Sequence, residues 1–248
     1  MRHLCQLLHV EGAALCTAHR DMVLHIGHRR WGIHCLLHLL AHIAHHASHL
    51  LSHCAAHSHS HHHSCRIHAT ATAEGGERHS VDARLRAAAE YVGPVYMRLG
   101  RLAVPVVNDE ENYTFEIGKG EILRDGTDVA IIANGLMVYE AIQAGEMLSA
   151  KGINAMIINM ATVKPLDEEL VIAAAKKCGK VITCEEHSII GGLGEAVASC
   201  LSEKLPTPVK RIGVNDEFGH SGPALDLLKE FGLTAEHIVE VVKEKLGK

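Results

Sequence analysis

The residues best suited to acid-base chemistry form a short cluster, Glu185, Glu186 and His187. Neighbouring carboxylates raise the basicity of an imidazole, which ordinarily titrates near neutral pH. A glycine-rich run at residues 191–194 follows, but its spacing is not Gly-x-Gly-x-x-Gly and no acidic residue is placed for a ribose, which argues against a dinucleotide site. The cluster also fits a capping or interface role. The glycines fit a close approach of a helix N-terminus to a sheet or to another chain.

A second set of candidate ligands lies in residues 1–79, which hold 19 of the 22 histidines and five of the eight cysteines. One group of histidines recurs every three or four residues and would line one helix face: His34, His38, His42, His46, His49 and His53. A second group follows as a tract: Cys54, His57, His59, His61, His62, His63 and Cys65. Side chains of these types at four-residue spacing can share Zn, Ni or Cu, so a metal-binding tract is one interpretation.

The composition of residues 1–79 nevertheless argues against a folded domain. The segment has no Lys, Asn, Phe, Tyr or Pro, and Trp31 is its single large aromatic residue. A core would have to bury many imidazoles with their hydrogen bonds satisfied. We therefore expect a poorly structured segment that is not a native domain. A targeting segment and translation of a slipped reading frame are the other interpretations, and translating the DNA upstream of codon 80 in all frames distinguishes them.

The elements that must position the Glu185 cluster follow from the hydrophobic pattern beyond residue 117, where apolar strand-like runs alternate with amphipathic helical ones. Strands are predicted at 120–123, 129–133, 155–159, 181–184 and 209–214, and helices at 137–150, 168–177, 194–204, 224–231 and 235–245. Parallel strands need crossover connections, so the predicted class is α/β, an open and mostly parallel sheet with helices on both faces. A further helix is predicted at 82–91 and a β-prone run at 95–99, before a polar linker at 108–116.

Ligands of open α/β sheets bind at the carboxyl ends of the strands, which here are residues 133–135, 185–194 and 215–222. The net charge of −5 with no Lys/Arg run argues against nucleic acid, and the apolar stretches are too interrupted to span a bilayer. Cys178, Cys184 and Cys200 lie in apolar surroundings without a CxxC pair, which indicates a reducing, cytoplasmic compartment.

Four separated motifs, at residues 87–101, 161–167, 185–194 and 218–233, closely resemble the C-terminal portion of transketolase. The resemblance implies that residues 80–107 are the end of a thiamine-pyrimidine domain and residues 117–248 a complete C-terminal domain, while residues 1–79 do not match. It implies ketol transfer between sugar phosphates with thiamine diphosphate and Mg²⁺. The glutamate and aromatic residues that hold the pyrimidine would fall in residues 1–79, where none can be assigned, and the Mg²⁺ and pyrophosphate ligands belong to another domain.

The resemblance therefore describes a chain that is inactive alone and needs an N-terminal subunit in a homodimer-type assembly. It places Arg101 where the family holds the phosphate of the sugar, a task suited to the planar guanidinium, with Arg98 a weaker candidate. The other reading of Arg101 is an ion pair with the acidic residues 109–111. Deoxyxylulose-phosphate synthase and the β chain of 2-oxo acid dehydrogenases share the domain plan. From other classes, a His-rich metal-binding protein and a non-catalytic dimerisation module remain alternatives.

Overall fold

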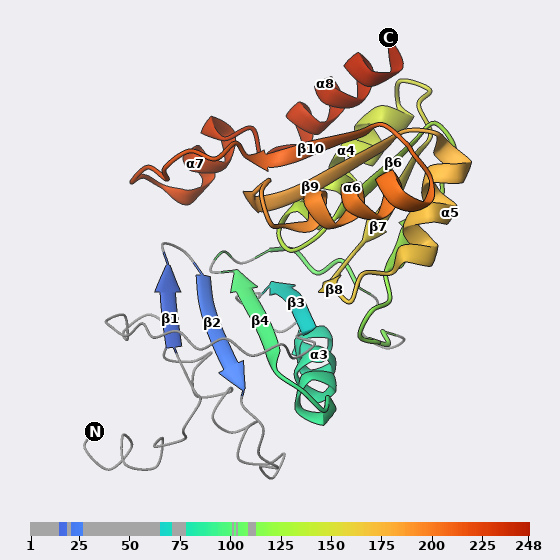
Figure 1. Ribbon diagram of the computed structural model, residues 1–248. Coiled ribbons are helices and arrows are strands. Elements are labelled where there is room, and N and C mark those ends of the chain that lie inside the picture. The colour runs from blue at the N-terminus through green and yellow to red at the C-terminus, as the bar shows by residue number, and fades with distance from the viewer. Residues whose placement is uncertain are drawn as a thin grey trace, which may run out of the picture.

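A computed structural model describes the backbone of residues 15–18, 21–26, 65–70, 78–100, 102, 104–108 and 113–248, and the side chains from residue 82 onward within these ranges. The described elements form two mixed sheets, one above the other in Figure 1. None of the described helices is long and apolar enough to cross a membrane.

The larger sheet has the order β10-β9-β6-β7-β5. Its strands are β5 (Glu121–Arg124), β6 (Val129–Ala133), β7 (Ala155–Asn159), β9 (Val181–Ser188) and β10 (Val209–Val214). The four strands from β10 to β7 pair in parallel, and β5 is the antiparallel edge. The helices are α4 (Met137–Ser149), α5 (Glu168–Cys178), α6 (Leu193–Lys204), α7 (Ala224–Glu230) and α8 (Ala235–Leu246). The predicted fold class for residues 117–248 is confirmed.

Successive residues of the central strand β6 point to opposite faces of this sheet, and both faces are covered. Ile131 packs in one core cluster with Leu148 of α4 and Ile238 of α8. Ile132 packs in the other with Val171 of α5 and Val197 of α6. All six of these side chains are buried, and each contributes about 1.5–3 kcal/mol relative to an exposed position. The uniformly apolar strand thus reflects two helical layers rather than one.

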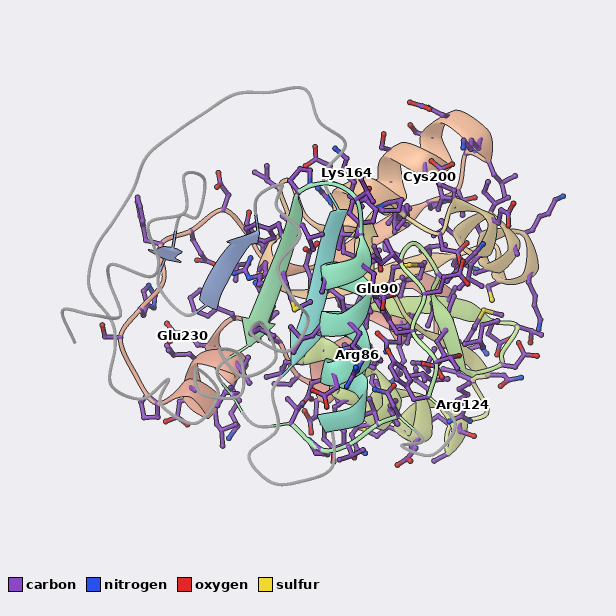
Figure 2. All side chains as sticks on the ribbon, turned by 90° about the horizontal axis from the view of Figure 1, so that it is seen from below. Arg86, Glu90, Arg124, Lys164, Cys200 and Glu230 are labelled. Carbon is purple, nitrogen blue, oxygen red and sulfur yellow. The ribbon has the colours of Figure 1, made fainter. Side chains whose placement is uncertain are left out.

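The smaller sheet has the order β1-β2-β4-β3-β8. It contains β1 (Leu15–Ala18), β2 (Asp21–Ile26), β3 (Cys65–Thr70), β4 (Val95–Gly100) and β8 (Thr162–Lys164). Helix α3 (Arg78–Glu90) contacts β3, and Figure 2 shows its exposed Arg86 and Glu90. Leu85 and Ala88 of this helix pack with buried residues of β4.

Two features of the smaller sheet differ from the sequence-based expectations. Strands β1, β2 and β3 come from residues 1–79, for which no strand was predicted. β2 and β3 pair with β4 on its two sides, and β1 pairs with β2. The histidines of the candidate metal tract between His34 and His63 lie outside the described residues. Strand β8 was also missed, because a three-residue strand gives almost no periodic signal, and it pairs with β3 although its neighbours along the chain belong to the larger sheet.

Candidate functional site at the carboxyl edge of the larger sheet

Three described segments leave the carboxyl ends of the parallel strands, as the sequence predicted. Asn134 and Gly135 follow β6, and the Asn134 N–H donates to the carbonyl of Cys184 at 3.2 Å. Gly135 has φ +57° and begins the turn into α4, a conformation that favours glycine. Residues 189–192 connect β9 to α6, and residues 215–223 connect β10 to α7. These loops are the framework for any chemistry at this edge.

Glu185 is a buried carboxylate at the centre of the framework. It is 1% exposed, and its two oxygens accept the backbone N–H groups of Leu193 at 2.9 Å and Gly194 at 2.8 Å. These groups belong to the first turn of α6, whose N–H groups have no partner within the helix. Glu185 therefore caps α6 from the neighbouring strand, where both the negative charge and the acceptor oxygens are favourable.

The glycines of the run at 191–194 explain how the carboxylate comes so close. A Cβ placed on Gly192 would lie 1.9 Å from Oε2 of Glu185, and one on Gly194 would lie 2.7 Å from Oγ1 of Thr183. Neither position has room for a side chain. The prediction that the glycines allow a helix N-terminus to approach the sheet is confirmed, and Glu185 is the group that they admit.

Burial raises the pKa of Glu185, while the N–H groups of Gly194 and Leu193 and the charges of Arg211 and Arg98 act in the opposite direction. A raised folded-state pKa means that the native state binds more protons than the unfolded state above pH 4.5, the ordinary value. The free energy of unfolding should therefore fall as pH rises from 4.5 through the folded-state pKa.

The matched variant for this prediction is Glu185→Gln, which does not titrate. Urea unfolding of both proteins across this pH range should show the stability of the wild type, relative to the variant, decreasing with pH and then levelling off. A relative stability that rises with pH would show that hydrogen bonding outweighs burial and that the pKa is lowered.

Glu186 and His187 are half-buried on the last part of β9, two to three residues beyond the predicted end of the strand. The charges of Glu186 and Glu185 act on Arg98 of β4 and partly offset the burial that lowers the pKa of its guanidinium. Glu185 therefore caps a helix and also acts, together with Glu186, on Arg98 of the smaller sheet. Whether Glu186 and His187 serve an interface or acid-base chemistry stays a prediction.

Arg101, the predicted phosphate-binding residue, lies outside the described residues, as do the acidic residues 109–111 of the alternative ion pair. Its assignment stays a prediction. Arg98, the weaker candidate, lies on β4 under the influence of the two glutamates. Nearby carboxylates disfavour a phosphate, so this environment argues against Arg98 as the phosphate ligand.

The loop at residues 215–223 presents a nearly fully exposed aromatic ring, Phe218, with 95% of its surface accessible. The loop is tied to α7 through His220, whose Nδ1 lies 2.5 Å from Oε1 of Glu230. The ring of His220 also packs near Phe231, with centroids 5.6 Å apart. Sequence analysis placed this loop at the edge but did not single out these side chains, because the Glu230 contact joins residues ten positions apart.

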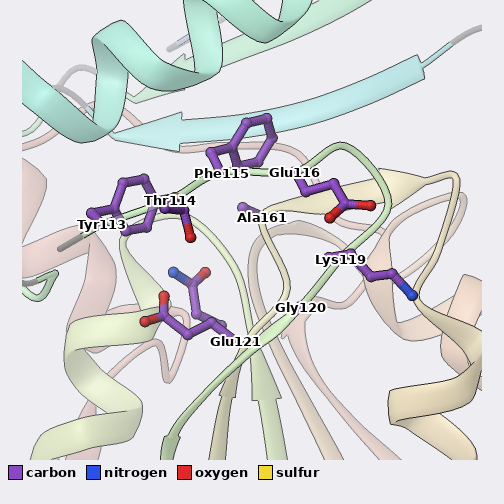
Figure 3. Close-up of a pocket in the computed structure, with 9 residues that line it drawn as sticks. Tyr113, Thr114, Phe115, Glu116, Lys119, Gly120, Glu121 and Ala161 are labelled. Atoms are coloured by element: carbon purple, nitrogen blue, oxygen red, sulfur yellow. The ribbon is translucent and has the colours of Figure 1, made fainter.

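Sequence analysis also missed a pocket of about 470 Å³ beside the edge strand β5 (Figure 3). One wall is the chain segment that leads into β5, including Tyr113, Thr114 and Glu116, and another is the end of β7 with Asn159. Arg84 of α3 donates to the hydroxyl of Tyr113 at 3.1 Å and so fastens this wall to the smaller sheet. No local motif marks the pocket, since its walls are distant along the chain.

The fold and its carboxyl edge define a parallel α/β domain with a helix capped by a buried glutamate from the neighbouring strand. Residues 118–238 match the family described as transketolase, C-terminal domain. This part of the chain therefore belongs to the transketolase C-terminal domain family.

The chain is also similar in sequence and structure to several known proteins. A 6-deoxy-6-sulfo-D-fructose transketolase subunit, SqwH, of Clostridium sp. (strain MSTE9) is 49% identical over 167 residues, covering 65% of this chain and 51% of its own. A 1-deoxy-D-xylulose-5-phosphate synthase of Heliobacterium modesticaldum is 44% identical over 162 residues, covering 64% of this chain and 25% of its own. A solved structure described as a split gene transketolase, inactive beta4 tetramer, superimposes with a TM-score of 0.68 at 44% identity, covering 75% of this chain and 58% of that one. The chain thus spans about half the length of the transketolase subunits it matches.

Proposed function

We propose that this chain is the C-terminal section of a transketolase-type enzyme that depends on thiamine diphosphate and transfers a two-carbon ketol unit between sugar phosphates. The observation that carries the proposal is the match of residues 118–238 to the transketolase C-terminal domain, joined by relatives that are named as transketolase subunits. An N-terminal transketolase subunit is the proposed partner, in a homodimer-type assembly in the cytoplasm.

The described residues do not fit the metal of the cofactor. Among them, no three His, Cys, Asp or Glu side chains gather in a way that could hold a metal ion. The Mg²⁺ and pyrophosphate ligands are proposed to come from the N-terminal partner, and we assign no step through the cofactor to this chain.

The contributions proposed for this chain are binding and positioning. Arg101 would hold the sugar phosphate, and Glu186 and His187 would line the carboxyl edge where the partner or the substrate approaches. Glu185 supports both by fixing the start of α6 and the loop before it. The chain would thus orient a substrate whose chemistry is completed by groups on another subunit.

The experiment is reconstitution. The chain alone should show little or no ketol transfer, since binding contributions without the activating groups leave the reaction near its uncatalysed rate. The assay mixes it with an N-terminal transketolase subunit, thiamine diphosphate and Mg²⁺, and measures transfer from a ketose phosphate to an aldose phosphate. Activity that appears in the mixture and not in the isolated chain would support the partner proposal. Robust turnover by the isolated chain would refute the proposed dependence on another subunit.

A second candidate is supported by the likeness to 1-deoxy-D-xylulose-5-phosphate synthase. To test for this synthase activity, the same mixture is supplied with pyruvate as the donor in place of the ketose phosphate. For the candidates from other classes, isothermal titration with Ni²⁺ or Zn²⁺ reports on a metal-binding tract in residues 1–79. A dimer that forms without any transfer activity would favour the dimerisation module.

A further inference from the structure

The connection between β4 and β5 packs against both sheets in crossed order. Leu102, Val104 and Val107 follow β4 of the smaller sheet, but they pack against the core of the larger sheet on the side of α4 and α8. Phe115 and Ile117 precede β5 of the larger sheet, but they pack with buried residues of α3 and β4 in the smaller sheet. Each sheet therefore holds the half of the connection that is adjacent, along the chain, to the other sheet.

Arg84 of α3 is the charged group at the second of these contacts. Only 4% of its surface is exposed, and an arginine is rarely buried to this degree without partners. Its Nη2 and Nε donate to the hydroxyl oxygen of Tyr113 at 3.1 Å and 3.3 Å. Its Cζ lies 5.7 Å from the ring centroid of Tyr113 and 5.9 Å from that of Phe115. A cation at such distances is attracted to the faces of aromatic rings.

The side chains that stabilise this buried cation come from one segment. Among the residues that the structure describes, no carboxylate forms an ion pair with Arg84. The charge of Arg84 acts on Glu121, where it partly offsets the rise that burial causes in the pKa of that carboxyl. Tyr113, Phe115 and Glu121 all lie in the stretch that leads into the larger sheet. Detaching this stretch would leave a charge buried without its partners, which is costly.

We propose that Arg84 is a positioning residue that fastens residues 113–117, here called the strap, to α3 and thereby fixes the smaller sheet relative to the larger one. The role in catalysis rests on the proposed ketol transfer. Arg101 follows β4 of the smaller sheet, whereas Glu186 and His187 lie on β9 of the larger sheet. Groups on two sheets can orient one substrate only if the sheets keep a fixed geometry, and small misplacements lower the rate strongly.

The test of the strap is limited proteolysis of the full chain with chymotrypsin, which cleaves after aromatic residues. Cleavage after Phe115 requires the strap to leave α3, so its rate reports the population of the detached strap. Cleavage after Phe218, which is 95% exposed, reports the activity of the protease. Cleavage after Tyr139, within α4, reports unfolding of the larger sheet. Mass spectrometry of the fragments measures the three rates in one experiment.

Arg84→Ala should raise the rate of cleavage after Phe115 at least about 30-fold, because hydrogen bonds and ring contacts are lost together. Tyr113→Phe keeps the ring and should raise this rate about fivefold. Arg84→Lys keeps the charge without the planar fork and should lie between wild type and Arg84→Ala. Arg86→Ala, at an exposed position of the same helix, is the matched control and should be cleaved as the wild type. Equal rates in Arg84→Ala and Arg86→Ala, or an equal rise after Tyr139 and Phe115, would overturn the strap.

Kinetics of the reconstituted enzyme test the positioning role. Arg84→Ala should lower kcat/KM for ketol transfer about tenfold, whereas Arg86→Ala should leave it unchanged. An unchanged kcat/KM of Arg84→Ala in an active mixture would overturn the positioning role. A mixture in which the wild type shows no transfer would instead contradict the proposed function, and the cleavage rates would still decide whether Arg84 fastens the strap.

Discussion

Gly192→Ala should lower the free energy of unfolding by about 3 kcal/mol, an unusually large effect for a single methyl group. The new Cβ would lie 1.9 Å from Oε2 of Glu185, so the carboxylate must leave the N–H groups of Leu193 and Gly194. Both the buried charge and the first turn of α6 then lose their partners. Chemical denaturation followed by circular dichroism measures the loss.

The reason for this loss can be isolated with a double-mutant cycle. Glu185→Ala removes the clashing oxygen along with the cap, and should itself cost about 2–3 kcal/mol. The double variant should then be about as stable as Glu185→Ala alone, because the clash no longer exists. Gly219→Ala, at a glycine whose Cβ would meet nothing within 4 Å, is the control and should change stability by less than about 0.5 kcal/mol. Simple additivity of the two changes would contradict the assigned contact.

Arg101→Ala, in the reconstituted enzyme, should weaken binding of phosphorylated sugars about 10- to 150-fold, since about 1.5–3 kcal/mol of charge-assisted hydrogen bonding would be lost. The loss should appear mainly in KM, because a phosphate remote from the breaking bond is held similarly in the ground and transition states. Steady-state kinetics with a phosphorylated acceptor measures both constants.

Non-phosphorylated acceptors provide the control for Arg101. Their kcat/KM should change little, and Arg101→Lys should restore only part of the phosphate binding because an ammonium lacks the two-pronged geometry. An arginine that instead braces residues 109–111 would affect both substrate classes and lower the melting temperature. Equal losses for the two classes would therefore reject the phosphate assignment.

The larger sheet was predictable because its signals are local. Strand β6 coincides with the predicted range. The ends of α8 and α4 carry residues of the usual types: Thr234 accepts from the N–H of His237, and Gly152 just past α4 has φ +71°. Each of these signals lies within a few residues of the element that it defines: the apolar periodicity, the capping threonine and the glycine just past a helix.

The parts that escaped prediction depend on contacts between distant segments. A capping role was one expectation for the Glu185–His187 cluster, but the sequence could not assign it to Glu185, because the helix that this carboxylate caps begins eight residues later. The neighbouring glycines indicated only a close approach. The pairing of Glu121 with Asn159 joins residues on separate strands, and the strand β8 exists only because β3 lies beside it. Such features arise from tertiary pairing, which periodicity and composition do not encode.

Strand β8 belongs to the smaller sheet although its neighbours along the chain belong to the larger one, and this affects where the chain can be cut into domains. The predicted boundary at residue 117 is drawn along the sequence, yet Thr162–Lys164 pairs with β3 on the other side of it. A recombinant protein starting at residue 117 would leave the backbone donors and acceptors of β8 without their partners, next to the buried Val163. Unpaired strand edges of this kind promote aggregation. Moving the start by a few residues would not restore the partner, whereas a start before β3, which keeps β3 and β4 with the domain, would preserve it.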